Sequence, residues 1–401
     1  MTYRKFKADY LFTGTELAAG DSVLITSEDG IVQAIIPATE AGEDVLQYNG
    51  LLSPGFVNCH CHLELSHMKG LLPEKTGLVD FLLAVMAHRN QPPAASPETS
   101  LQEHIRSSIE TAEQEMLDNG IVAVGDICNT IDTIPQKTAG RLYYHNFIET
   151  MGFLPSAAAQ RFDHSRKIFD TFAQAYTLPV EANSIVPHAP YSVSPELFRL
   201  VAGFPGNHVL TIHNQEDPEE NAFYLSARGD FLRLYKTLGL DVSFFSGTGK
   251  RSLESIVPHF YHNQSLILVH NVATNEEDLR SIADTPNLFF CLCPCANLYI
   301  GGRLPEVDTL RRSGIPIVIG TDSLASNHQL SILGEIKVLQ RAFPQLPTPD
   351  LLQWSTLNGA RALQMETALG SFLPGRQPGV VLIDNLEETR LTDRSGVTRL
   401  V

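Results

Sequence analysis

Residues 51–70, LLSPGFVNCHCHLELSHMKG, combine an apolar strand pattern with two closely spaced histidines. The apolar run breaks at Pro54 and Gly55, resumes, and then carries His60 and His62 two residues apart. Residues i and i+2 of a strand point to the same face, so the two imidazoles would lie side by side. Neighbouring imidazoles at a strand end suit a metal ion. A half-buried strand with a polar face of two histidines is the alternative, and this stretch alone does not separate the two.

The composition indicates a globular protein and argues against two classes of partner. The chain has 401 residues, 43% of them hydrophobic, and a formal net charge of -16, which disfavours a nucleic-acid surface. No segment approaches the ~20 apolar residues that a membrane span needs. The basic N-terminus lacks the apolar region of a secretion signal. The six cysteines are therefore expected to be free thiols of a cytoplasmic protein that acts on a small molecule.

Apolar segments separated by helical patterns, such as residues 101–119 and 330–343, occupy the middle of the chain. Near-continuous apolar runs are typical of parallel strands buried on both faces. Eight such strands alternating with helices predict an α/β fold, a (β/α)8 TIM-type barrel. The expected strands are residues 55–58, 121–126, 142–149, 183–187, 208–213, 265–270, 288–293 and 315–320.

The two chain ends share a different pattern of short strands broken by turns. Segments 10–12, 22–26 and 31–36 recur about every ten residues, which suggests an antiparallel sheet. Segments 369–375 and 380–384 return to this style. We therefore expect a small β-sandwich domain built from residues 1–53 and 366–401, with the barrel spanning residues 54–365. Residues 91–97 form a short proline-rich connector within the barrel region.

Polar residues follow the expected barrel strands at the ends where catalytic groups gather in such barrels. Each alone has a simpler explanation: a single histidine is commonly a hydrogen-bonded loop residue, and Asp322 could cap a helix. Together they require a common cause, and a metal site is the economical one. The residues are His60, His62, His188, His213, Glu216, His270 and Asp322.

Neutral imidazoles with a carboxylate suit zinc, with iron as the alternative. A carboxylated lysine could bridge two metals from a strand near the middle of the barrel. No lysine occurs between Lys167 and Lys236, so that bridge has no obvious donor. The sequence therefore predicts one divalent metal ion.

This ordered set resembles the amidohydrolase superfamily, specifically its aromatic-deaminase and chlorohydrolase branch. The motifs that carry the resemblance are His60-x-His62, His213-x-x-Glu216, His270 and Asp322, with residues 187–191 (PHAPY), 293–297 (CPCAN), 320–323 (GTDS) and 356–361 (TLNGAR) in support. The resemblance spans nearly the whole chain. One departure is Gln377-Pro-Gly379, where Lys/Arg-x-Ala-Asp is more usual, and it lies outside the metal motifs.

The resemblance implies a role for each of these side chains in hydrolytic deamination. A water molecule activated by the metal would be the nucleophile, oriented and deprotonated by Asp322 and His270. Glu216 would carry a proton to a ring nitrogen and then to the leaving amine. His188 would hydrogen-bond the substrate or the tetrahedral intermediate. The metal ligands that the resemblance implies are His60, His62, His213 and Asp322.

The substrate is suggested by a finer resemblance. Residues 62–67 (HLELSH), followed by residues 77–83 and Arg89, resemble aminodeoxyfutalosine deaminases, whereas many related deaminases carry Gln at the position of Glu64. That substrate is an adenine nucleoside bearing a benzoate, so Arg89 and Arg303 are candidates to meet its carboxylate. For each arginine, a solvated surface position is the alternative.

The expected activity is therefore that of a hydrolase on carbon–nitrogen bonds other than peptide bonds, a cyclic amidine deaminase. Dechlorination of a triazine-like ring, or opening of a cyclic amide, is the alternative on the same site. A non-catalytic barrel scaffold is the alternative of another class, although such proteins typically lose ligands and none is missing here. A homodimer is left open.

Overall fold

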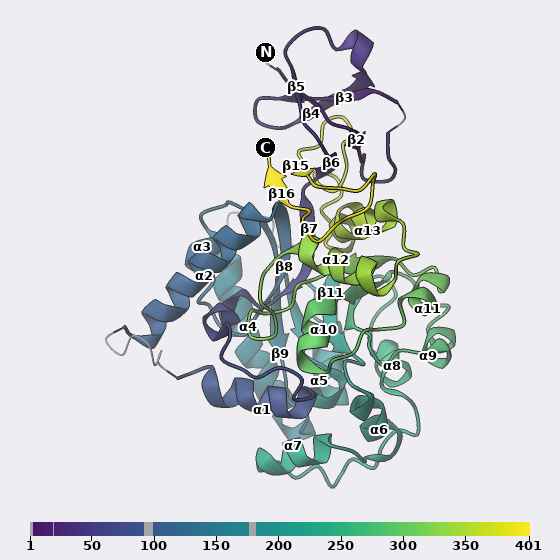
Figure 1. Ribbon diagram of the computed structural model, residues 1–401. Helices are drawn as coiled ribbons and strands as arrows, with labels where there is room; N and C mark the ends of the chain where they lie inside the picture. Colours follow the sequence, from purple (N-terminus) through teal and green to yellow (C-terminus); the bar gives the residue numbers. More distant parts are fainter. Residues whose placement is uncertain (1–2, 19, 92–98, 176–181) are drawn as a thin grey trace.

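The computed structural model describes residues 3–18, 20–91, 99–175 and 182–401 (Figure 1). Most of the proline-rich connector, residues 92–97, lies outside the described residues. A large body of helices and strands carries a smaller strand-rich part that holds both chain ends, drawn at the top of Figure 1. Among the described residues, no helix has the length and apolar character required to cross a bilayer.

Parallel strands form the centre of the large body. They are β7 (Phe56–Cys61), β8 (Ile121–Cys128), β9 (Tyr143–Thr150), β10 (Asn183–Pro187), β11 (Val209–Asn214), β12 (Ser265–His270), β13 (Leu288–Leu292) and β14 (Ile317–Ile319). They pair in chain order as two four-stranded sheets, β7 to β10 and β11 to β14. In addition β10 packs beside β11, and β14 packs beside β7. The carboxyl ends of all these strands therefore lie on the same side of the body.

Helices follow most of these strands and pack on them. They are α1 (Leu78–His88), α2 (Leu101–Asp118), α3 (Ile134–Lys137), α4 (Ala158–Ala175), α5 (Pro195–Ala202), α6 (Pro218–Ser226), α7 (Phe231–Thr237), α8 (Ser252–Ile256), α9 (Glu276–Ser281), α10 (Pro294–Ile300), α11 (Val307–Arg312), α12 (Ile332–Ala342), α13 (Thr348–Ser355) and α14 (Leu357–Ala362). Helix α2 begins with a capping box in which Ser100 and Glu103 each bond the other's backbone amide, which satisfies two amides that have no partner inside the helix. The predicted helices at 101–119 and 330–343 are thus confirmed.

The eight predicted strands are all present, with some ends displaced. Strand β7 runs on through His60 to Cys61, beyond the predicted end. Strand β14 is shorter than predicted, because the chain after Ile319 turns toward β7. There the amides of Thr321 and Asp322 both donate to the carbonyl of His60, each at 3.0 Å.

The smaller part contains two four-stranded sheets. Their strands are β1 (Tyr3–Lys7), β2 (Tyr10–Leu11), β3 (Ser22–Ser27), β4 (Val32–Pro37), β5 (Val45–Gln47), β6 (Leu51–Pro54), β15 (Val380–Ile383) and β16 (Val397–Arg399), in the orders β4-β3-β1-β5 and β16-β15-β6-β2. A small apolar cluster joins side chains from both sheets, including Phe6, Leu52 and Val380. The two chain ends therefore share one core.

Two expectations for this part are wrong. The sheets are not wholly antiparallel, since β5 pairs with β1 and β6 pairs with β2 in parallel. A parallel neighbour needs a longer connection than a hairpin turn, and the intervening strands supply it. Residues 369–375 form turns instead of a strand, with positive φ at Gly370 and Gly375.

Gly55 joins the two parts at the point where the sequence breaks its apolar run. Strand β6 ends at Pro54, paired with Val380, and β7 begins at Phe56. A Cβ at Gly55 would lie 2.3 Å from the Val122 side chain and 2.9 Å from the Pro378 carbonyl. Only glycine allows the chain to pass so close to both neighbours.

Candidate metal centre and active site

Four side-chain atoms converge at the carboxyl ends of β7, β11 and β14. The Nε2 atom of His62 lies 3.2 Å from Nε2 of His60 and 3.3 Å from Nε2 of His213. Oδ1 of Asp322 lies 3.5 Å from Nε2 of His60 and 3.4 Å from Nε2 of His62. The structure thus brings together the four residues that the sequence proposed as ligands.

These distances fit a divalent ion better than a set of hydrogen bonds. A neutral imidazole has one N–H, so three Nε2 atoms cannot all donate to one another. Ligand nitrogens about 2.0–2.1 Å from a tetrahedral zinc ion would be ~3.3 Å apart, as these are. The donor set of imidazoles and one carboxylate also suits zinc or iron.

The surrounding polypeptide orients His213 and Asp322 and lets Asp322 approach His60. Nδ1 of His213 contacts the carbonyl of His188 at 2.7 Å, and a proton held there leaves the Nε2 lone pair free to bind metal. Ser326 Oγ donates to Oδ2 of Asp322 at 2.6 Å, which leaves Oδ1 facing the histidines. Gly320 makes this approach possible, since a Cβ there would lie 2.8 Å from the Cβ of His60.

Burial sets the charge of these groups. It lowers the pKa of His62, and with the neighbouring His60 it lowers the pKa of His213 to about 4. Both imidazoles are therefore neutral near pH 7, as metal binding requires. Burial acts to raise the pKa of Asp322, but its contacts with His60 and His62 outweigh it and hold that pKa well below the ordinary value.

Glu216 and His270 form a pair beside this cluster. Oε1 of Glu216 lies 3.6 Å from Nε2 of His270, and their side chains are 7% and 1% exposed. Nδ1 of His270 contacts the side-chain amide of Asn297 at 2.9 Å. Burial, and then the charge of Asp322, raise the pKa of Glu216 well above its ordinary value. Burial therefore favours the protonated form of Glu216, which a proton shuttle requires.

Backbone strain accompanies the site. His270 has a φ of 74° and Asp322 has a φ of 56°, in the left-handed region that L-residues rarely adopt. Such conformations persist when surrounding contacts enforce them, and they cluster at functional sites. Here they aim both side chains at the four-atom cluster.

His188 lies at the edge of the same site. Its ring is 4.8 Å from that of His213, centroid to centroid, and its Nδ1 contacts Ser192 Oγ at 2.7 Å. Burial lowers its pKa to about 4, so the ring is neutral. A neutral ring held through Nδ1 has Nε2 available for a further hydrogen bond.

Glu149 belongs to this site and was not identified from the sequence. It lies near the end of β9, with Oε2 accepting from the side-chain amide of Asn129 at 3.0 Å. Its other oxygen, Oε1, is buried 3.6 Å from Nδ1 of His213 and has no hydrogen-bond partner among the described residues. The available signal was its place at a strand end, the same signal that singled out the histidines.

Glu64 and Arg89 form a separate cluster beside the loop that follows β8. Oε2 of Glu64 accepts from the amides of Asn129 (3.0 Å) and Thr130 (2.8 Å) and from the Thr130 hydroxyl (2.9 Å). Arg89 Nη2 lies 3.4 Å from its Oε1. The Glu64 carboxylate thus fixes the loop that carries Asn129, and through Asn129 it supports Glu149.

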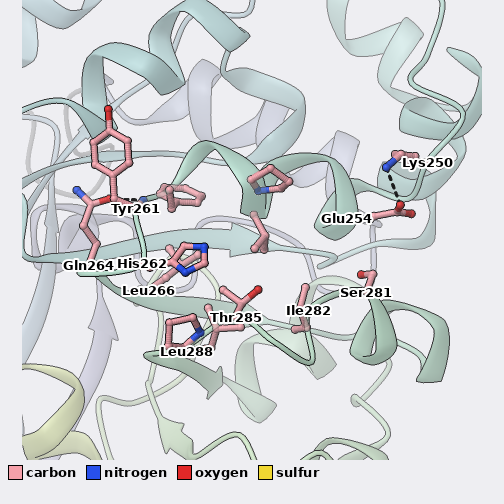
Figure 2. A pocket seen from close by; sticks show the side chains of 14 residues that line it. Lys250, Glu254, Tyr261, His262, Gln264, Leu266, Ser281, Ile282, Thr285 and Leu288 are labelled. Carbon is pink, nitrogen blue, oxygen red and sulfur yellow. Dashed lines mark hydrogen bonds and ion pairs between the residues drawn. The ribbon is translucent and has the colours of Figure 1, made fainter.

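Arg303 comes near Glu216 from the loop after α10. The two residues line a cavity of about 10 Å³, together with Leu78, Pro218 and Ile300. A cavity of about 410 Å³ lies elsewhere, between α8 and α9 (Figure 2). Leu266 and Leu288 line it from the amino ends of β12 and β13, so it is separate from the histidine cluster.

A buried ion pair supports the segment after His62 and was also missed. Lys137 Nζ contacts Asp126 Oδ2, with both side chains fully buried, and it donates to Asn146 Oδ1 at 2.8 Å. Asp126 Oδ1 accepts from the amide of Leu63 at 2.8 Å. The pair therefore anchors the backbone next to a candidate ligand.

Comparisons with known proteins identify the family and the fold of the chain. The 5-methylthioadenosine/S-adenosylhomocysteine deaminase of Teredinibacter turnerae is 24% identical over 386 residues, covering 91% of this chain and 79% of that protein. The aminodeoxyfutalosine deaminase of Nitratiruptor sp. is 25% identical over 349 residues, covering 84% and 79%. The crystal structure of Helicobacter pylori aminofutalosine deaminase with methylthio-coformycin has a TM-score of 0.80 at 20% identity, covering 97% of this chain and 93% of that chain.

The fold of that solved structure is therefore the fold of this chain. A sequence model of the amidohydrolase family matches residues 51–399, which include all the candidate site residues. This match confirms the resemblance seen in the sequence motifs. The chain belongs to the amidohydrolase family.

Proposed function

We propose that this protein is a metal-dependent deaminase that releases ammonia from an amino-heterocycle, with an adenine nucleoside such as aminodeoxyfutalosine as its substrate. The observation that carries the proposal is the four-atom cluster of His60, His62, His213 and Asp322 beside the pair of Glu216 and His270. Hydrolytic loss of ammonia needs an activated water and a proton donor near the departing nitrogen. This arrangement supplies a place for both.

One divalent ion, zinc or alternatively iron, would be held by His60, His62, His213 and Asp322. Such an ion, when bound, supplies Lewis-acid activation of a water molecule. The distances between the ligand atoms support one ion at this position. A solved adenosine deaminase from Xanthomonas campestris, which has a TM-score of 0.70 against this chain, contains bound zinc.

The other side chains would bind the substrate and move protons. Protonated Glu216 would give its proton to a ring nitrogen and later to the leaving amine. Asp322 and His270 would orient the attacking water, and the Asp322 carboxylate would accept its proton, since the Asn297 amide donates to Nδ1 of His270 and leaves the ring proton on Nε2. His188 would hydrogen-bond the substrate through Nε2.

Glu64, Arg89 and Arg303 are the proposed substrate-contacting residues at the periphery. The side chain of Arg89 is 28% exposed and meets the Glu64 carboxylate on one side, so it could meet an anionic group of a ligand on another. Arg303 shares its cavity with Glu216. The names of the relatives, which include aminodeoxyfutalosine and methylthioadenosine deaminases, support a nucleoside substrate.

The proposed architecture is a closed (β/α)8 barrel of residues 54–365, with a β-sandwich formed by residues 1–53 and 366–401. The contact of β14 with β7 supports closure, and the core shared by the two terminal sheets supports the sandwich. The six cysteines are free thiols, which supports a reducing, cytoplasmic location.

A panel of amino-heterocycles tests the activity. Purified protein with its metal content measured would be incubated with aminodeoxyfutalosine, adenosine, methylthioadenosine and guanine, and ammonia release would be followed. The proposal requires release from at least one adenine nucleoside. Silence on this panel, with chloride released from a chlorotriazine or a cyclic amide opened, would support the rival reactions. Silence throughout would favour a non-catalytic scaffold.

A further inference from the structure

Gln215, the residue before Glu216, is held in an unusual backbone conformation. It directly follows β11 and has a φ of 46°, in the left-handed region. A glutamine has no special tolerance for this region, so other contacts must enforce it. Its side chain is fully buried.

Each polar group of the Gln215 side chain is hydrogen-bonded. Nε2 donates to Oδ1 of Asn221 at 3.1 Å and to Oδ1 of Asp278 at 2.9 Å. Oε1 accepts from the hydroxyl of Thr274 at 2.6 Å. The backbone is fixed as well, since the Gln215 amide donates to Oε1 of Glu220 at 2.9 Å.

These bonds connect the loops that carry the two members of the proton-transfer pair. Thr274 and Asp278 follow His270 in the segment after β12, and the Gln215 carbonyl accepts from the amide of Ala273 at 2.8 Å. Asp278 is itself fixed by Arg251, which donates through Nε at 2.8 Å. Gln215 therefore links the loop that carries Glu216 to the segment after His270 through hydrogen bonds.

We propose that Gln215 is a positioning residue that holds the Glu216 carboxyl beside Nε2 of His270, in the orientation that proton transfer to the substrate requires. This inference rests on the proposed deaminase function. The reason is geometric: a proton shuttle works at hydrogen-bond range, and a misplacement of about 1 Å can reduce the rate roughly 100-fold.

A second buried glutamine offers a matched control. Gln264 donates through Nε2 to the carbonyls of Ala202 and Asn207, each at 3.0 Å, and accepts from the amide of Tyr261. It also ties loops together, but at the amino end of β12, next to the cavity of Figure 2. A general loss of loop anchoring would affect both glutamines, whereas a positioning role belongs to Gln215 alone.

The test compares Gln215→Met with Gln264→Met, each of which removes the amide while keeping side-chain length. We expect Gln215→Met to lower kcat at least tenfold, with KM within twofold and metal content per chain unchanged. Gln264→Met should keep kcat within twofold. Equal kcat losses in the two variants, or an unchanged kcat in Gln215→Met, would overturn the proposal.

Two further measurements keep the proposal testable. If Gln215→Met fails to fold, Thr274→Val can be used instead, because it removes a single hydrogen bond to Gln215. This variant should also lower kcat, but by less. An unchanged kcat in Thr274→Val would count against the positioning role of Gln215. A crystal structure of the variant gives a readout without activity. The separation of Glu216 Oε1 from His270 Nε2 should grow beyond 3.6 Å, and an unchanged separation would refute the positioning role even if the wild type released no ammonia.

Discussion

The two ends of strand β12 lie in very different surroundings. At the amino end, the lining of the cavity of about 410 Å³ includes an ion pair, Lys250 with Glu254 at 2.8 Å. The left-handed residue there is Asn287, a type that tolerates this conformation. At the carboxyl end, His270 is itself left-handed, and its buried Nε2 has no hydrogen-bond partner among the described residues.

The larger cavity and the candidate site therefore lie at opposite ends of strand β12. None of the residues that line the larger cavity has a buried polar side-chain atom without a partner among the described residues, whereas the crowded end holds strained residues and buried atoms that lack such partners. An unpaired buried polar atom is costly unless a ligand completes it. The strand end that carries the candidate site is thus identified by buried polar atoms without hydrogen-bond partners among the described residues, and not by the volume of a cavity.

Removal of a ligand should have the largest effect. We expect His60→Ala to lose most of its bound metal and to reduce turnover to background, because His60 contributes one of the four converging atoms. Elemental analysis and ammonia release measure the two effects. Full metal content in this variant would contradict the assigned ligand set. His262→Ala, at the cavity of Figure 2, is the control and should keep its metal.

Glu216→Gln should have the second largest effect, a loss of turnover. Loss of a proton shuttle typically reduces turnover about 10²–10⁴-fold. Metal content should be unchanged, since Glu216 is not one of the four ligands. Near-normal turnover in this variant would show that protons reach the substrate by another route.

Lys137→Met should mainly affect stability. It would leave Asp126 buried and uncompensated, which typically costs about 3–5 kcal/mol. Urea unfolding of the metal-loaded protein measures the change. Lys250→Met removes a solvent-exposed pair at the opposite end and should change stability by less than about 1 kcal/mol. Similar values for the two variants would contradict the distinction between buried and exposed pairs.

Glu149→Gln should have a smaller effect on catalysis. A hydrogen bond from substrate to the open carboxylate oxygen would contribute about 1.5–3 kcal/mol, so kcat/KM should fall roughly ten- to a hundredfold. The amide can still accept from Asn129, which should preserve the loop. An unchanged kcat/KM across the nucleoside panel would mean that Oε1 meets only solvent.

The smallest change is expected from Thr285→Val, which alters the lining of the cavity in Figure 2. Turnover and metal content should both stay within twofold of the wild type. A large loss of turnover would show that the amino end of β12 is coupled to the site, and it would remove the contrast between the two ends.

Much of the fold was predictable because parallel buried strands leave a strong local signal. The expected strand at 183–187 matches β10, and the one at 265–270 matches β12. The prediction was weaker at the chain ends. Strands β1 and β5 are short and partly exposed, with little periodicity, and strand direction depends on connections that local sequence does not encode.

The candidate site was predicted in part for the same reason. His213 and His270 end apolar runs, so their place at a strand end could be inferred from sequence alone. The sequence around Gln215 and Lys137 gives no comparable signal of their importance. Their importance lies in hydrogen bonds and an ion pair to segments that sequence spacing does not bring together.

By itself the sequence determined the order of the strands and the end of the strands at which the candidate residues lie. These follow from local periodicity and from residue type, whereas the identity of the proposed ligands was implied by the resemblance of the motifs to a known family. Only the tertiary structure decided that Asp322 meets His60, because that contact depends on β14 lying beside β7 and on the absence of a side chain at Gly320. It also decided that Gln215 links two loops. The energy of a buried hydrogen bond depends on the partner, and packing determines which distant residue comes close enough to be that partner.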